Sequence, residues 1–281
     1  MDAVLLALAS AFLFGAMTVA IRIALRRGAG PEAGALATVL TAVAVTAPFA
    51  LVQRGAVVEV WPFLLAGLLG PGLSQLLFTF AVREAGPSRT SVVVGTAPLF
   101  SVVIAVLLLG EPLQAGLVAG ALLIVGGGGL LVSERGRPEH VRVVGLLLAL
   151  AATAVFAVRD NLVRWLAIDT DVSPGAAAIS TLAAGAAVIA AYLVVTRAPI
   201  QRRSARAFVP AGVLFGLSYV CLFEAYFHGP VTVVSPLVAT ECLWGVGLSA
   251  AVLGASERIG LRLVAGALLV VLGSVVIGVS R

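Results

Sequence analysis

One acidic residue lies deep inside a long apolar stretch of the chain. Glu241 is about eleven residues into the stretch 231–253, close to its centre. An ionisable group at the centre of a membrane helix costs about 2.5–3.5 kcal/mol on insertion scales for Arg, Lys or Asp, so it needs a reason. A carboxyl group there could load and release a proton or bind a cationic group of a substrate. The alternative is a permanently protonated acid that hydrogen-bonds to another helix.

Two adjacent charged residues, Arg159 and Asp160, lie inside the apolar stretch 143–165. Asp160 precedes Arg164 by four residues, which is the favourable order for an ion pair within one helix. Arg159 is rotated about 100° from Asp160 around a helix, and it has no acidic residue three or four positions away. We therefore expect Arg159 to reach water, a ligand or another helix. We expect it to act at an outer gate or on an anionic part of a substrate, and Arg164 to be largely structural.

Glu224, in the apolar stretch 208–227, is a candidate partner for Arg159 on another helix. His228 follows it by four residues and competes for it. Arg22 and Arg164 lie near the ends of their helices. Long arginine side chains in such places can reach the membrane surface, and we expect both to do so.

Three further residues are candidates for lining a cavity. Gln75 and Ser218 occupy equivalent places near the middle of the stretches 62–82 and 208–227, where either an interhelical hydrogen bond or a ligand contact is plausible. Trp244 follows Glu241 by three residues and shares its helical face. It could pack against a neighbour, belong to an interfacial belt, or form a cavity wall beside the acid. The two cysteines do not form a CxxC pair, and no metal-binding spacing is present, so we expect no metal and no cofactor.

These residues must be positioned by membrane helices. Of the 281 residues, 61% are hydrophobic and only 11% are charged, and the mean hydropathy is +1.15. Soluble chains are about 45–50% apolar and about 25% charged. The apolar runs are continuous and about 20 residues long, which is typical of membrane-spanning helices and excludes barrel strands. The sequence therefore predicts an all-α integral membrane protein with ten transmembrane helices, at residues 3–24, 33–52, 62–82, 90–109, 114–132, 143–165, 175–195, 208–227, 231–253 and 260–279.

The two halves of the chain repeat one another. The clearest matches pair Leu5–Ala9 with Leu147–Ala151, and Val118–Leu123 with Val264–Leu269. Each copy holds five helices, an odd number, so the second copy must enter the membrane from the opposite side. Inverted repeats of this kind are characteristic of secondary transporters. The predicted organisation is a first five-helix repeat, an inter-repeat loop and a second five-helix repeat, at residues 1–133, 134–142 and 143–281.

The sequence resembles the EamA-type branch of the drug/metabolite transporter superfamily. Each half has a Gly-Pro turn before its fourth helix and an acidic residue before its fifth. The matching residues are Gly86-Pro87, Pro98, Gly110-Glu111 and Gly120 in the first half, and Gly229-Pro230, Glu257 and Gly266 in the second. The resemblance implies a central cavity lined by helices 1, 3, 4, 6, 8 and 9. The second half departs from the first at Cys242, which stands where the first half has Pro98.

The basic residues indicate an orientation. All 18 are arginine, and cytoplasmic loops retain such residues. Thirteen lie in or beside the loops after odd-numbered helices: Arg26, Arg27, Arg83, Arg89, Arg135, Arg137, Arg142, Arg197, Arg202, Arg203, Arg206, Arg258 and Arg262. We therefore expect a multi-pass protein of the plasma (inner) membrane, with the odd-numbered loops in the cytoplasm and both termini outside.

These observations predict a secondary transporter that is not an enzyme. The expected substrates are metabolites, amino-acid-like compounds or amphipathic compounds, which the protein would export by alternating access. No nucleotide-binding motif is present, so coupling would use protons or substrate exchange. The alternatives are a membrane-embedded enzyme and a non-transporting sensor. The expected partners are a small-molecule substrate and the lipid bilayer, not nucleic acid, and no feature points to an oligomeric state.

Overall fold

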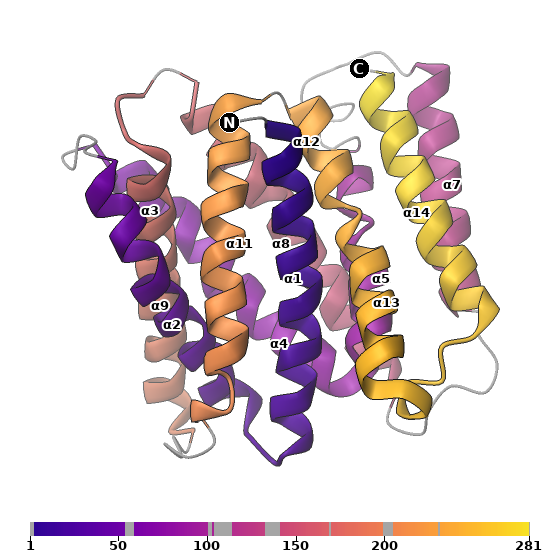
Figure 1. The fold of residues 1–281 in the computed structure, drawn as a ribbon, viewed down its shortest axis with the longest axis horizontal. Helices are drawn as coiled ribbons and strands as arrows, with labels where there is room; N and C mark the ends of the chain where they lie inside the picture. The colour runs from indigo at the N-terminus through magenta and orange to yellow at the C-terminus, as the bar shows by residue number, and fades with distance from the viewer. Residues whose placement is uncertain are drawn as a thin grey trace.

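The protein is a bundle of helices. The computed structural model describes residues 3–53, 59–100, 103, 114–132, 141–168, 170–198, 205–229 and 231–280, and within these ranges all regular structure is helical. The start of α1 and the end of α14 lie at the same end of the bundle (Figure 1). We call this end the termini face, and the other end the opposite face.

The helices follow the order of the predicted spans. The first half contains α1 (Ala3–Arg26), α2 (Pro31–Val52), α3 (Trp61–Gly67), α4 (Ser74–Ala85), α5 (Pro87–Val94) and α7 (Ala115–Val132). The second contains α8 (Val143–Leu166), α9 (Pro174–Thr196), α11 (Val209–His228), α12 (Val231–Val238), α13 (Glu241–Leu253) and α14 (Leu261–Val279). A π-helical segment, Leu68–Leu73, joins α3 to α4, so Trp61–Ala85 forms one span.

Eight segments of the described chain are long and apolar enough to cross a membrane, and the helix over Ala115–Leu131 is apolar but shorter. The predicted all-helical membrane architecture is therefore confirmed. The expected span 90–109 is described only at residues 90–100 and at 103. The motif residues Gly110, Glu111 and Pro230 lie outside the described residues.

Helix packing follows the internal repeat. Helix α1 packs against α11, and its counterpart α8 packs against α4, the counterpart of α11. Helices α2 and α9, which are counterparts, pack directly against each other, and so do α7 and α14. Each of these contacts is therefore matched by an equivalent one when the two halves are exchanged.

Glycines set the spacing between α7 and α14. A Cβ added at Gly120 would lie 2.6 Å from the Gly273 carbonyl oxygen, and one added at Gly273 would lie 2.6 Å from the Gly120 oxygen. A Cβ added at Gly127 would similarly meet the Gly266 oxygen at 2.6 Å. Small residues let membrane helices approach at backbone distance, where van der Waals packing holds them together. The two helices thus form a closely packed pair.

Two helices are interrupted at equivalent positions near the middle of the bundle. The helical pattern breaks at Gly95-Thr96 after α5, and at Ala239-Thr240 between α12 and α13. At each break the threonine hydroxyl donates to the carbonyl three residues earlier at 2.6 Å, Thr96 to Val93 and Thr240 to Leu237. Discontinuous helices at membrane depth are typical places for binding sites, because irregular backbone there is tolerated where it lines a cavity.

Candidate functional site

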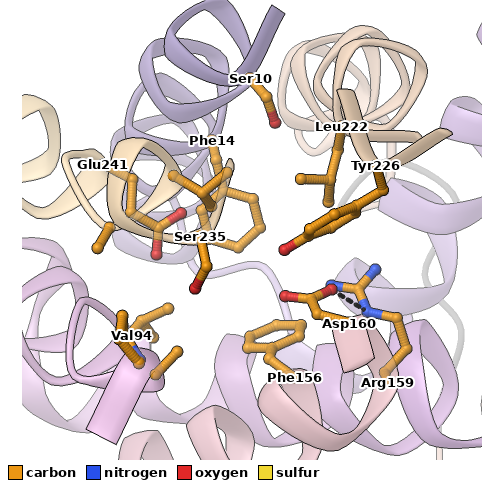
Figure 2. A pocket seen from close by; sticks show the side chains of 14 residues that line it. Ser10, Phe14, Val94, Phe156, Arg159, Asp160, Leu222, Tyr226, Ser235 and Glu241 are labelled. Atoms are coloured by element: carbon orange, nitrogen blue, oxygen red, sulfur yellow. Dashed lines mark ion pairs between the residues drawn. The ribbon is translucent and has the colours of Figure 1, made fainter. Parts of the chain in front are cut away.

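A cleft lies between the two halves, beside the helix breaks. It is bounded by α1, α8, α11, α12, the start of α13 and the end of α5 with the residues just after it (Figure 2). Its empty volume is about 500 Å³, including open space at its mouth. The lining residues are Ser10, Phe14, Val94, Ala97, Pro98, Phe156, Arg159, Asp160, Leu222, Tyr226, Ser235, Val238, Ala239 and Glu241.

Arg159 is held firmly at the edge of this cleft. Its side chain is 4% exposed, and its Nε lies 2.8 Å from Oδ1 of Asp160. Its Nη1 donates to the Tyr219 hydroxyl at 2.6 Å, and the guanidinium lies 5.1 Å from the Tyr219 ring centre and 5.5 Å from that of Phe156. A buried charge needs such partners, since one left unpaired would be strongly destabilising. The position of the Arg159 guanidinium is therefore set by an acid, a phenol and two ring faces.

The expected ion pair between Asp160 and Arg164 is wrong. Asp160 pairs with its neighbour Arg159, and Arg164 donates from Nη1 to the Tyr226 carbonyl oxygen at 2.7 Å. The Arg159 guanidinium lies over the rings of Phe156 and Tyr219, and both Arg159 and Asp160 line the cleft. Arg164 lies one turn further on, where the last turn of α11 offers a carbonyl group.

Glu241 is the acidic group that has no protein partner in the cleft. It is 4% exposed, it begins α13 directly after the break at Thr240, and its side chain points into the cleft (Figure 2). Within the described part of the chain its carboxyl group forms no hydrogen bond and no ion pair. The first turn of a helix carries partial positive charge, which favours an anion there. The carboxyl group is thus placed for something that enters the cleft.

The cleft combines charge with apolar walls. Asp160 lies beside the Arg159 guanidinium and the Tyr226 hydroxyl, and Glu241 lies on the other side of the cleft (Figure 2). Phe14 and Phe156 form part of the wall between these groups. Such a site can hold a small molecule that carries an amine and an apolar body, and it can also accept an anionic group at Arg159.

Ser218 and Gln75 lie inside the bundle but do not line the cleft. The Ser218 hydroxyl hydrogen-bonds to the Ser10 hydroxyl at 3.0 Å and to the Ser10 carbonyl oxygen at 3.1 Å, joining α11 to α1. Gln75 is fully buried on α4, and its side-chain amide has no hydrogen-bond partner among the described residues. The structure therefore supports the interhelical role for Ser218.

Glu224 and Trp244 lie on the outside of the cleft walls. Glu224 accepts a hydrogen bond from Gln53 and lies 3.4 Å from His228, so the competition of His228 is confirmed and the pairing with Arg159 is wrong. Trp244 is 44% exposed and packs edge-on against Phe12 with ring centres 5.1 Å apart. Glu241 points into the cleft, while Trp244, three residues later on α13, is rotated by about 60° around the helix and faces outward.

The expectation that Arg22 reaches the membrane surface is also wrong. Its side chain is buried, and Nε donates to Oε1 of Glu257 at 3.2 Å. This contact spans 235 residues of sequence, so helical spacing could not indicate it. Tyr226 and Ser235, both in the cleft, were also missed, because neither phenols nor hydroxyls stand out in an apolar stretch.

Comparison with known proteins agrees with this architecture. A model of the EamA-like transporter family matches residues 1–133 and 143–279. A solved structure described only as "Crystal structure of protein" aligns over 98% of this chain and 95% of its own, with a TM-score of 0.68 and 23% sequence identity. At that identity the likeness supports the fold alone. No curated protein matches the chain significantly.

Proposed function

Because the chain belongs to the EamA-like transporter family, we propose that it carries a small molecule across the membrane by alternating access between two inverted halves. The contacts of α1 and α8, which are equivalent helices, support the inversion. The end of α1 reaches the end of α4 through Arg22 and the Arg83 carbonyl at 3.1 Å. The start of α8 reaches the same place through Arg142 and the Glu84 carbonyl at 2.8 Å. The two helices therefore run in opposite directions, which is the arrangement that alternating access uses.

The observation that carries the proposal is the carboxyl group of Glu241, which lies in a cleft between the halves and has no hydrogen-bond or ion-pair partner among the described residues. A buried polar group without a partner costs free energy, so a carboxyl group at this position favours a role in binding. Glu241 would take a cationic group of the substrate or a proton, and Arg159 would take an anionic group. The aromatic walls suit an apolar body. Amino-acid-like and amphipathic amine compounds fit this arrangement best, and the proposed direction is export.

The proposed orientation places the opposite face in the cytoplasm. Arg26, Arg27, Arg83, Arg89 and Arg142 all lie at this end, near the ends of α1 and α4 and the starts of α5 and α8. An excess of arginine in short loops marks the cytoplasmic side. The termini face, toward which the cleft is displaced, would then be outside.

Flux in reconstituted vesicles tests the proposal. Labelled amines and amino acids are offered to the purified protein under an imposed pH gradient. The wild type should concentrate at least one of them, and Glu241→Gln should lose concentrative transport while remaining folded. Glu224→Gln, an acid outside the cleft, is the matched control and should transport normally. Wild-type flux, affinity and pH dependence in Glu241→Gln would remove Glu241 from the site, and chemical conversion without flux would favour a membrane-embedded enzyme.

A further inference from the structure

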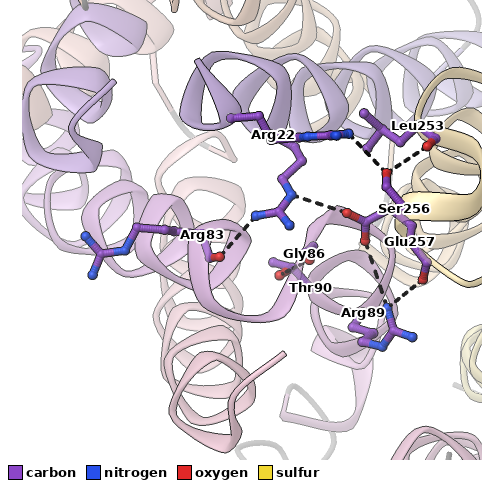
Figure 3. Close-up of polar contacts among 9 residues, drawn as sticks. Arg22, Arg83, Gly86, Arg89, Thr90, Leu253, Ser256 and Glu257 are labelled. Carbon is purple, nitrogen blue, oxygen red and sulfur yellow. Dashed lines mark hydrogen bonds and ion pairs between the residues drawn. The ribbon is translucent and has the colours of Figure 1, made fainter. Parts of the chain in front are cut away.

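Three charged groups are buried together at the opposite face. Glu257, in the turn between α13 and α14, is fully buried, and so is Arg89 in the first turn of α5. Arg22 donates from Nε to Oε1 of Glu257 at 3.2 Å, and Arg89 lies 3.9 Å from Oε2 (Figure 3). Arg89 also donates from Nη1 to the Glu257 carbonyl oxygen at 3.1 Å. One carboxylate thus joins two guanidinium groups.

This cluster ties the two halves together. Arg22 and Arg89 belong to the first repeat, and Glu257 belongs to the second. Arg26 adds a hydrogen bond to the Ser256 hydroxyl at 3.0 Å, again from the first half to the second. Gly86 lies directly against the carboxylate, since a Cβ added there would be 2.5 Å from Glu257 Oε2. The end of α1, the start of α5 and the turn after α13 are therefore fastened at one point.

The cleft lies on the other side of the bundle's middle. On α1 it is lined by Ser10 and Phe14, and Arg22 follows on the same stripe, eight residues or about 12 Å beyond Phe14. On α8 it is lined by Phe156, the counterpart of Phe14, and then by Arg159 and Asp160, which lie nearer the end of the helix. Because the two helices run in opposite directions, both sets extend from the phenylalanines toward the termini face. The cleft is displaced toward that face, and the charged cluster lies at the other.

The repeat has an equivalent place on the termini face, where the described residues form no matching ion pair. Glu111, the counterpart of Glu257, lies outside the described residues. Arg164 is the counterpart of Arg22, and Tyr226 is the counterpart of Arg83. Both arginines make the same backbone contact, to the carbonyl of Arg83 at 3.1 Å and of Tyr226 at 2.7 Å. Within the described residues Arg164 has no carboxylate within 4.0 Å, whereas Arg22 holds Glu257. Among the described residues, the ion pairs of Glu257 with Arg22 and Arg89 therefore close the opposite face.

We propose that Arg22, Arg89 and Glu257 form an ionic latch, which holds the opposite face closed while the cleft is formed toward the termini face and which opens in each transport cycle. This inference rests on the proposed function, since a latch matters only if that face opens. A buried ion pair suits a reversible closure, because its attraction is largely offset by desolvation and the charges regain water when they separate. Removing one partner instead leaves an uncompensated buried charge, which destabilises the closed arrangement.

Thiol labelling tests the latch without a substrate. Thr18 is fully buried one turn before Arg22 on the same face of α1. Thr18→Cys is placed in a background in which Cys221 and Cys242, the only two cysteines, are replaced. The labelling rate of purified protein by a water-soluble thiol reagent is then measured with the latch intact and with Glu257→Gln. Glu257→Gln should raise the labelling rate by about tenfold or more. Without the ion pairs the closed state is less stable, so a larger fraction of molecules exposes Thr18→Cys.

Three comparisons make the result specific. Glu84→Gln removes an acid that pairs with Arg83 and Arg142 at the same face and should not change the rate. Glu257→Asp keeps the charge and should label more slowly than Glu257→Gln. A second reporter, Thr38→Cys on α2, is equally buried and should stay protected in every variant, whereas general loosening of the fold would expose it. If Glu257→Gln does not fold, Arg89→Gln is measured in its place.

An unchanged Thr18→Cys rate in the latch variants, or equal exposure of both reporters, would overturn the latch. Thiol labelling does not depend on transport. The labelling experiment therefore still tests the latch if the flux experiment fails. Conversely, Glu241→Gln should alter flux without altering the labelling of Thr18→Cys.

Discussion

Phe14 and Phe156, which occupy equivalent positions in the two repeats, meet edge to face with their ring centres 5.9 Å apart. Such a contact between equivalent residues places the pair on the pseudo-two-fold axis that would relate the halves. The cleft extends from these rings toward the termini face. In the other direction, α1 continues from Phe14 to Arg22 at the opposite face. The two rings therefore lie between the cleft and the charged latch.

We predict that the Phe14 ring separates the cleft from the part of α1 that holds Thr18 and Arg22. Phe14→Ala should let a thiol reagent reach Thr18→Cys even when the latch is intact, because truncation of this partly buried ring opens space in the core. Phe12→Ala removes an exposed ring from the same helix, where Phe12 contacts Trp244, and should have no such effect. The measurement is the labelling rate in the wild-type latch background. Equal rates for the two variants would show that the ring does not seal the cleft.

The packing of α7 on α14 predicts opposite effects for two adjacent glycines. Gly127→Ala should lower the free energy of unfolding by about 1–3 kcal/mol, because its Cβ would lie 2.6 Å from the Gly266 carbonyl oxygen and the helices would have to separate. Gly126→Ala meets no atom within 4 Å and should be neutral or stabilise by up to about 1 kcal/mol through helix propensity. Thermal unfolding in detergent measures both. A smaller loss for Gly127→Ala than for Gly126→Ala would contradict the close packing.

Gly86 provides a prediction about the latch itself. It has φ +80° and ψ 165°, a conformation open essentially to glycine only, and its Cβ position is occupied by the Glu257 carboxylate. Gly28 also has a positive φ, of 81°, but no atom lies within 4 Å of its Cβ position. Gly28→Ala should therefore show backbone strain alone, about 1–3 kcal/mol. Gly86→Ala should cost more and should also raise the labelling of Thr18→Cys. Equal behaviour of the two variants would mean that contact with Glu257 is unimportant.

Exposed residues at the two ends test the orientation. Arg27 and Arg206 lie after the first and seventh predicted spans, and Glu59 lies before the third. In intact cells a membrane-impermeant thiol reagent should label Glu59→Cys and spare Arg27→Cys and Arg206→Cys, because arginine-rich loops stay in the cytoplasm. Labelling of the two arginine positions with protection of Glu59→Cys would reverse the topology. Arg137 and Arg203, which gave the same expectation, lie outside the described residues.

The sequence predicted the membrane-spanning helices well. Continuous apolar runs indicate the segments that contact lipid, and the internal repeat indicates how the helices are arranged. The sequence also pointed to Glu241, Arg159 and Asp160, which line the cleft, since charges in apolar helices are costly and therefore conspicuous. It could not predict which charges meet. The ion pair of Arg22 with Glu257 depends on how α1 packs against the turn after α13, and that packing is not encoded in the spacing along one helix. The position of Trp244 was missed for a related reason: three residues along a helix leave a rotation of about 60°, and only the packing of α13 decides which of the two side chains enters the cleft.

The pair formed by Arg159 and Asp160 allows a test that separates structure from transport. Arg159→Gln removes a buried partner from Asp160 and a hydrogen bond from Tyr219, so it should lower flux and also cost stability. A loss of flux in this single variant is therefore ambiguous. Arg164→Gln is the comparison, since it removes only the contact to the Tyr226 carbonyl at the helix end and should affect stability more than flux.

The double variant Arg159→Gln/Asp160→Asn resolves the ambiguity. It leaves no uncompensated charge, so it should recover most of the thermal stability that the single variant loses. If Arg159 and Asp160 bind the substrate, flux in the double variant should stay low although the protein is stable, because both charged groups that would orient the substrate are gone. Substrate affinity, measured by the concentration dependence of flux, should weaken for compounds that carry both an amine and a carboxylate more than for simple amines. Recovery of flux together with stability would show that the pair serves only to hold α8 against α11.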